Sequence, residues 1–278
     1  MQKTFEIDAP AELEIRLASG DIDIDPTHEG RVEVELTADD EDSQELIDNA
    51  TVELRGRTLV VDVPQKRGGF SFNFFGRSGI TCRVRGPKGS SVTARTKSAD
   101  LRARGTIGGL TYATASGDVR ADEVAGNVNV KSASGDITIR KVAGSVNAQT
   151  ASGDVEIDTV MGPVNAQSAS GDVTIDAAYG DVHGTVVSGD LTLEAVMAGE
   201  VRAQSVSGDV SIGVRRGSKV FLDCNTLSGD TTSELELQTD APAGDGPLVE
   251  INAKTVSGDI LIRRAPAPVN DDAQEVHA

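Results

Sequence analysis

The sequence predicts an all-β protein, a single-stranded parallel β-solenoid with coils of about 18 residues. Three observations support this fold class. The tripeptide Ser-Gly-Asp recurs every 18 residues, and glycines recur every nine residues from Gly108 to Gly189. Apolar residues also occupy equivalent positions in successive 18-residue units, as the stacked inward positions of a solenoid require. The full tripeptides of the regular stretch begin at Ser116, Ser134, Ser152, Ser170 and Ser188.

The nine-residue half-unit has room for a strand of about five residues and a turn of about four. We therefore expect two main strands in each coil and two facing parallel sheets. A left-handed hexapeptide helix also has 18-residue coils, but it would show a six-residue period. None is visible, so a right-handed coil is favoured. Two predicted inward columns are Val119, Ile137, Val155, Val173 and Leu191, and Ala121, Ile139, Ile157, Ile175 and Leu193.

The chain divides into three regions. Residues 1–97 contain short runs of alternating apolar and charged residues, which predict half-buried strands of the same solenoid. This region also holds an early Ser19-Gly20-Asp21 and an acidic stretch, 39–50, which reads as one or two helical turns. Residues 98–264 carry the regular repeats, with the spacing lengthening after Asp190. The Pro-rich, acidic residues 265–278 are expected to be a disordered tail.

A Phe-rich segment at 66–79 interrupts the N-terminal strands. It holds Phe70, Phe72, Phe74 and Phe75, framed by cations and glycines. Clustered aromatic residues beside cations are typical of loops that bind a partner. The segment is therefore a candidate interaction loop. The alternative is a loop that folds over an end or flank of the solenoid, whose small core residues need bulky cover.

Composition narrows the possible partners and locations. The net charge of −18 argues against nucleic acid and against anionic lipid, since both are bound through Lys and Arg. The N-terminus lacks the apolar segment of a signal peptide, and 18 apolar residues never run together, so neither export nor direct membrane insertion is expected. We expect a cytoplasmic protein in which Cys82 and Cys224 are buried, reduced thiols.

The Ser-Gly-Asp turns place carboxylates in a column. Glycine supplies a positive φ, and the Asp or Ser can accept backbone N–H groups that the turn leaves unpaired. Neighbouring carboxylates about 4.8 Å apart repel by about 0.9 kcal/mol at a dielectric constant of 80. An N–H bond to a carboxylate is worth roughly 1.5–3 kcal/mol, so capping alone can hold the column. The predicted ladder is Asp118, Asp136, Asp154, Asp172, Asp190 and Asp209.

A calcium-binding β-roll is the alternative interpretation of this ladder. Such rolls also have a nine-residue period, but their motif carries additional glycines whose carbonyl groups act as ligands. Here only alternate nonamers carry the tripeptide, so no cofactor or metal is predicted. Polysaccharide-active enzymes also use β-helices. However, no pair of carboxylates is singled out, Trp is absent, and His28, His183 and His277 are isolated. We therefore expect no enzymatic activity.

Several strings resemble a known family. The segment RVRGPKGSSVTARTKSADL, the units SASGDVTI and TASGDVEI, and the closing TVSGDILIRR resemble bacterial β-strand-repeat proteins labelled "putative adhesins", also called the toastrack family. The resemblance covers about residues 80–264. It implies a β-helix-like solenoid without established catalytic residues, and an interaction module near envelope-stress systems. The adhesin label would suggest export, which the N-terminal sequence does not support.

Three functions follow from these observations. The first is a non-enzymatic scaffold that binds an unidentified protein along a sheet or through the Phe-rich loop. The second is a structural protein whose solenoids join end to end into filaments, because unpaired strand edges promote such contacts. The third is a polysaccharide-active enzyme or a calcium-binding β-roll. The acidic charge and tail favour a monomer over a filament.

Overall fold

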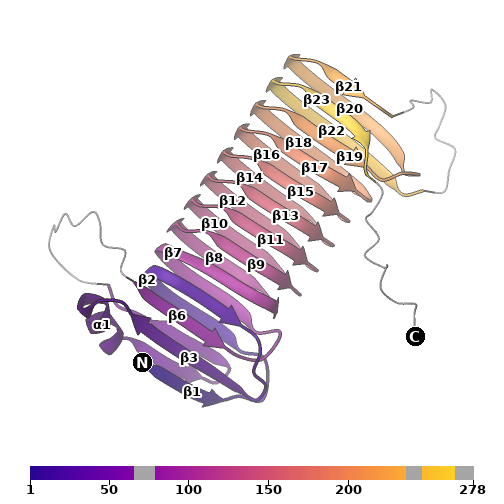
Figure 1. Cartoon of the computed structure of the whole chain (residues 1–278). Helices are drawn as coiled ribbons and strands as arrows, with labels where there is room; N and C mark the ends of the chain where they lie inside the picture. The colour runs from indigo at the N-terminus through magenta and orange to yellow at the C-terminus, as the bar shows by residue number, and fades with distance from the viewer. Residues whose placement is uncertain (66–78, 236–245, 267–278) are drawn as a thin grey trace, which may run out of the picture.

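A computed structural model describes residues 1–65, 79–235 and 246–266 of the chain. The described residues form one long stack of strands with the N-terminal elements at one end and β20 to β23 at the other (Figure 1). The Phe-rich loop, including Phe70, Phe72, Phe74 and Phe75, and most of the tail fall outside the described residues. The predictions made for them stay predictions.

The middle of the chain is a parallel β-solenoid with two strands in each coil, which confirms the predicted fold class. Each strand pairs in parallel with the strand 18 residues further on, for example Val128 with Val146 and Ile137 with Val155. The handedness of the coil stays a prediction. These strands are β8 (Leu110–Ser116), β9 (Val119–Val124), β10 (Val128–Ser134), β11 (Ile137–Val142), β12 (Val146–Ser152), β13 (Val155–Val160), β14 (Val164–Ser170), β15 (Val173–Ala178), β16 (Val182–Ser188) and β17 (Leu191–Val196).

The core is a thin double layer between the two sheets. Both predicted inward columns are buried, and Ile139 and Ile157 have no exposed surface at all. The outward positions between them carry polar residues in ladders: the Asn147 side-chain amide donates to the Asn129 side-chain oxygen at 3.0 Å, and Asn165 donates to Asn147 at 2.9 Å. Alternation of apolar and polar residues thus sets which side of each strand faces the core.

The N-terminal region joins the same stack. The long strand β2 pairs in parallel with β7, which places Ser19 opposite Ser98 and Asp21 opposite Asp100. The early Ser-Gly-Asp is therefore a coil of the solenoid, next in space to a coil about 80 residues away in sequence. The N-terminal elements are β1 (Gln2–Glu6), β2 (Glu12–Asp25), β3 (Arg31–Ala38), α1 (Glu41–Asp48), β4 (Thr51–Arg55), β5 (Thr58–Asp62), β6 (Ile80–Arg85) and β7 (Ser91–Ile107).

The N-terminal end of the stack is closed by antiparallel strands and a helix. Strands β1, β3 and β6 extend one sheet, and β4 and β5 extend the other. The helix α1 begins at its N-cap Asp40, whose carboxylate accepts the Ser43 N–H, and it packs on β3 with Ile47 fully buried. The helical turns predicted for residues 39–50 are confirmed. The two sheets are also bridged at this end, since the Lys3 ammonium donates to the Val52 carbonyl at 2.9 Å.

At the C-terminal end, the order of coils in space departs from their order in the sequence. Strands β22 and β23 lie between β18/β19 and β20/β21, pairing with both. The last coil of the stack is therefore formed by β20 and β21 (Figure 1). These elements are β18 (Gly199–Ser207), β19 (Val210–Val214), β20 (Lys219–Ser228), β21 (Thr231–Ser233), β22 (Leu248–Ser257) and β23 (Ile260–Arg264).

Both cysteines are free thiols, but they differ in burial. Cys82 is fully buried as expected, and burial raises the pKa of its thiol to about 12. Cys224 is only half-buried, because it lies on β20 in the outermost coil and lacks a described coil on one side. The prediction of a buried thiol is therefore wrong for Cys224.

Candidate functional site

The Ser-Gly-Asp turns form one edge of the solenoid. Their glycines adopt positive φ, as predicted; φ is 138° at Gly153, for example. Space is a second constraint, because a Cβ at Gly153 would lie 2.3 Å from the Gly135 carbonyl oxygen in the adjacent coil. The glycines of the opposite turns, such as Gly144 and Gly162, are needed for space and not for positive φ: a Cβ at Gly162 would lie 2.6 Å from the Gly144 oxygen.

The predicted ladder residues lie in one column, but their carboxylates do not bond within their own turns. Each carboxylate accepts the backbone N–H of the aspartate in the next coil, so that Asp154 accepts from Asp172 at 2.8 Å and Asp136 from Asp154 at 3.0 Å. This is a correction to the expected turn-closing bond, and it joins neighbouring coils. The whole column, in spatial order, is Asp100, Asp118, Asp136, Asp154, Asp172, Asp190, Asp209, Asp259 and Asp230.

The two ends of the ladder differ in charge compensation. At the N-terminal end the Arg102 guanidinium lies 3.6 Å from the Asp100 carboxylate and 3.0 Å from Asp21. At the C-terminal end the Asp230 N–H donates to Asp259, and the Asp230 carboxylate has no partner among the described residues. The column of negative charge is thus neutralised at one end and open at the other.

Replacing Asp154 by alanine should lower the free energy of unfolding by about 1–2 kcal/mol, because the Asp172 N–H loses its acceptor. Replacing it by asparagine keeps an acceptor oxygen and removes one charge from the repelling column, so the change should stay within about 0.5 kcal/mol. Chemical denaturation of the two variants beside the wild type measures both values. A loss for Asp154→Asn as large as that for Asp154→Ala would show that the ladder needs the charge itself, and a rise in Tm with millimolar calcium would support a metal-bound ladder.

A second feature of this edge was missed at the level of the sequence. The residue before each Ser-Gly-Asp points outward, and it is alanine in four successive coils from Ala115 to Ala169. In the four coils at the C-terminal end it becomes larger. These residues are Val187, Val206, Val256 and Leu227, exposed by 47, 49, 47 and 82 %, and we call them the apolar ridge.

The pairing of the strands makes the apolar ridge continuous. Ser188 pairs with Ser207, Ser207 with Ser257, and Ser257 with Ser228, so the residues just before them lie side by side in adjacent coils. Four coils spaced about 4.8 Å apart give a ridge roughly 14 Å long. The Asp ladder runs parallel to it, three residues further along each coil. The ridge is therefore an apolar line bordered by carboxylates.

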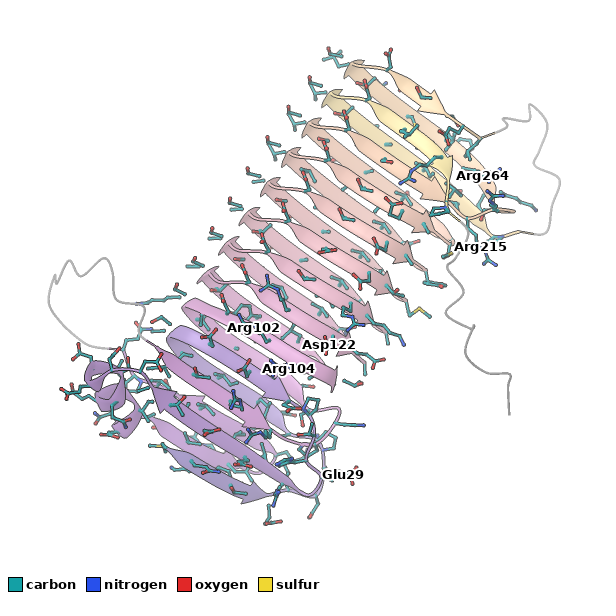
Figure 2. The ribbon with its side chains drawn as sticks, viewed as in Figure 1. Glu29, Arg102, Arg104, Asp122, Arg215 and Arg264 are labelled. Carbon is teal, nitrogen blue, oxygen red and sulfur yellow. The ribbon has the colours of Figure 1, made fainter. Side chains whose placement is uncertain are left out.

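Cations gather at the opposite turn of the last coils. Arg215 and Arg264 both lie at this edge (Figure 2), with Arg216 and Lys219 in the same turn region. None of these four makes an ion pair within the described residues, and a buried guanidinium nitrogen of Arg264 has no hydrogen-bond partner. Because the chain as a whole is strongly acidic, this corner is a distinct local concentration of positive charge.

Titratable groups elsewhere form no recognisable catalytic pair. The pKa of Asp176 is raised by partial burial and by the neighbouring carboxylates of Asp158 and Glu194, in an outward-facing acidic row. A depression of about 240 Å³ near the N-terminal end is lined by several cations and one carboxylate, Asp62. Its lining therefore lacks the two facing carboxylates that glycoside hydrolysis uses.

The described ranges were also considered for metal and membrane sites. Across residues 1–65, 79–235 and 246–266, no three His, Cys, Asp or Glu side chains lie close enough together to hold a metal ion. Among the elements of these same ranges, no helix combines the length and apolar character needed to span a bilayer.

The stacked coils and their glycine-dependent turns define a repeat scaffold, in which surface columns and not a cleft carry the conspicuous chemistry. A family model described as Toastrack DUF4097 matches residues 11–263, and the chain belongs to this family. The family resemblance stated from the sequence is confirmed. No curated protein matches the chain.

Solved structures share the architecture at low sequence identity. A "putative adhesin" from Bacteroides fragilis is 11% identical, with a TM-score of 0.50, and the match covers 94% of this chain and 96% of that one. A "putative adhesin" from Parabacteroides merdae is 12% identical, with a TM-score of 0.44 and coverage of 94% and 95%. A "putative lipid binding protein" from Parabacteroides distasonis is 16% identical, with a TM-score of 0.40 and coverage of 94% and 96%.

Proposed function

We propose that this protein is a non-enzymatic solenoid scaffold that binds another protein along the apolar ridge. The observation that carries the proposal is the change from alanine to valine and leucine at one outward position in four adjacent coils. Alternation along a strand predicts a polar or small residue there, and fully exposed apolar rows are unfavourable in water. A partner that covers Val187, Val206, Val256 and Leu227 would remove this cost.

The chemistry of the ridge describes the partner. The apolar line is bordered by the carboxylates of Asp190, Asp209 and Asp259, each of which uses one oxygen for the next N–H. A complementary surface has apolar side chains in a row with Lys or Arg beside them. Membership of the Toastrack family and the adhesin description of a solved relative fit such a role. A link to envelope-stress signalling and a cytoplasmic location belong to the same proposal, and the two free thiols fit the latter.

Site-specific photo-crosslinking tests this function. A photoreactive phenylalanine at position 256 should crosslink a protein in the cells that produce the chain, and the double variant Val206→Asp/Val256→Asp should lose that protein in affinity capture. The matched control is Ala133→Asp/Ala151→Asp, which changes the same outward column in coils without the ridge. Equal loss in both double variants, or equal crosslinking from positions 256 and 151, would contradict the proposed surface.

The Phe-rich loop stays a second predicted contact for the partner. Deleting residues 66–79 separates the two: capture that survives the deletion and fails in the ridge variant assigns binding to the ridge. Loss in the deletion alone would assign it to the loop.

A further inference from the structure

The last coil of the solenoid leaves a strand edge unpaired. Strand β20 pairs with β22, and β21 pairs with β23; neither has a second neighbour among the described strands. An unpaired edge presents a row of backbone N–H and C=O groups that readily accepts another strand. The inward side of β20 is also incompletely covered, because Val220, Leu222 and Cys224 pack on the core but are only half-buried.

The N-terminal end does not offer a complementary surface. There α1 covers the core with Ile47, and Lys3 donates to a carbonyl of the outermost strand β4. Both edge strands at that end carry charges, such as Lys3 and Glu6 on β1 and Glu53 and Arg55 on β4, which discourage strand addition. Strand β20, in contrast, exposes Phe221 by 65% and Leu227 by 82%. Head-to-tail stacking, which would produce filaments, is therefore disfavoured.

We propose that two copies of this chain associate through their C-terminal ends, with the two β20 strands paired antiparallel about a two-fold axis at Cys224. A two-fold axis perpendicular to the solenoid makes the two stacks meet end to end and reverses the strand direction. Such an interface is isologous and closes at two copies. It continues both sheets of one solenoid into the other and covers the half-buried side chains of the last coil.

The alternation of β20 restricts the register. The core-facing residues of one copy must meet core-facing residues of the other, so residues facing each other are separated by an even number of positions, or none. Centring the pair on Cys224 uses nearly the whole strand. This register places Phe221 opposite Leu227 on the outer face, twice, and Leu222 opposite Thr226 on the core side. Aromatic and aliphatic cross-strand pairs of this kind stabilise antiparallel sheets.

The charges of the two corners agree with the same arrangement. Strand β20 begins beside the cations Arg215, Arg216 and Lys219 and ends two residues before Asp230, whose carboxylate is the open end of the ladder. Antiparallel pairing brings the cationic corner of each copy against the acidic corner of the other. Figure 2 shows Arg215 at the edge where β20 begins. An arrangement with parallel β20 strands would instead superimpose like charges.

Sedimentation of the full chain tests the dimer. We expect a monomer–dimer equilibrium with a midpoint on the order of micromolar, as for a small interface. Phe221→Asp, a change at an exposed position, should shift the midpoint upward at least tenfold without lowering Tm. Val187→Asp, on the ridge but away from the last coil, is the control and should leave the midpoint unchanged. High salt should also weaken the dimer.

Cys224 provides an independent measurement of the register. Paired Cα atoms across an antiparallel two-fold lie about 4.5–5.5 Å apart, which a disulfide can span. Air oxidation with copper phenanthroline should therefore give a covalent dimer that Cys224→Ser abolishes and Phe221→Asp reduces, while the buried Cys82 does not react. The noncovalent dimer should survive in Cys224→Ser.

Three results would overturn the proposal. The first is a monomer up to about 0.5 mM. The second is growth beyond two copies, and the third is a dimer that is neither weakened by Phe221→Asp nor crosslinked through Cys224. The dimer and the ridge can fail separately, because Val206→Asp/Val256→Asp should abolish partner capture and keep the dimer, whereas Phe221→Asp should do the reverse.

Discussion

Replacing Gly153 by alanine is expected to lower the free energy of unfolding by about 3–5 kcal/mol, the largest effect of any single substitution considered. Two costs add. A φ of 138° is a conformation that residues with a Cβ rarely adopt, and the new Cβ would meet the Gly135 carbonyl oxygen at 2.3 Å. Because that oxygen belongs to the backbone of a rigid neighbouring turn, the coils have to separate to relieve the contact.

The matched control for this change is Gly56→Ala. Gly56 also has a positive φ, 62°, but nothing lies within 4 Å of its added Cβ. Its cost should therefore be limited to the backbone conformation, about 1 kcal/mol. Thermal and urea unfolding followed by circular dichroism compare the two variants. Similar losses for Gly153→Ala and Gly56→Ala would mean that the close stacking of turns contributes little to stability.

The second large effect is expected at Ile157, which is fully buried between Ile139 and Ile175 of the adjacent coils. Ile157→Ala should cost about 2–5 kcal/mol, and Ile157→Val about 0.5–1.5 kcal/mol, since the coils above and below cannot collapse into the cavity. Leu222→Ala in the last coil should cost less, because Leu222 is only half-buried in a single chain. Denaturant midpoints of the three variants give the comparison.

The position of the loss can also be measured for Ile157→Ala. Each coil contacts only its two neighbours, so amide exchange should speed up most around residues 137–178. A uniform increase along the whole stack would contradict this local response. An effect of Leu222→Ala as large as that of Ile157→Ala at high protein concentration, and smaller on dilution, would indicate that association buries Leu222.

Much of the fold could be predicted because the repeat imposes one condition on every coil. A residue such as Ile139 lies above and below an equivalent residue, so the apolar columns appear directly as an 18-residue period. Positive φ at the Ser-Gly-Asp glycines follows equally from the tripeptide. The helix at residues 41–48 was visible because Asp40 and the acidic first turn provide an N-terminal cap signal.

Two features could not be predicted, for a common reason. The period tells which residues are equivalent, but not which coil is adjacent to which once the spacing becomes irregular. Both 219–233 and 248–264 carry a Ser-Gly-Asp and alternating apolar residues, so either could follow β18 and β19. The carboxylate bonds between coils depend on the same adjacency. The apolar ridge did leave a signal, the change from Ala169 to Val187 before the tripeptide, but a valine in a strand is ordinarily assigned to the core.

The coil formed by residues 248–264 has a consequence for the order of folding during synthesis. Coils between residues 110 and 214 can each add to the preceding one as they leave the ribosome, since every neighbour is already made. The coil at 219–233 has no such surface available, because the strands on which it stacks are translated after it. The C-terminal end therefore matures last, and a chain stopped near residue 240 would carry both an unstacked coil and an open edge on β18 and β19.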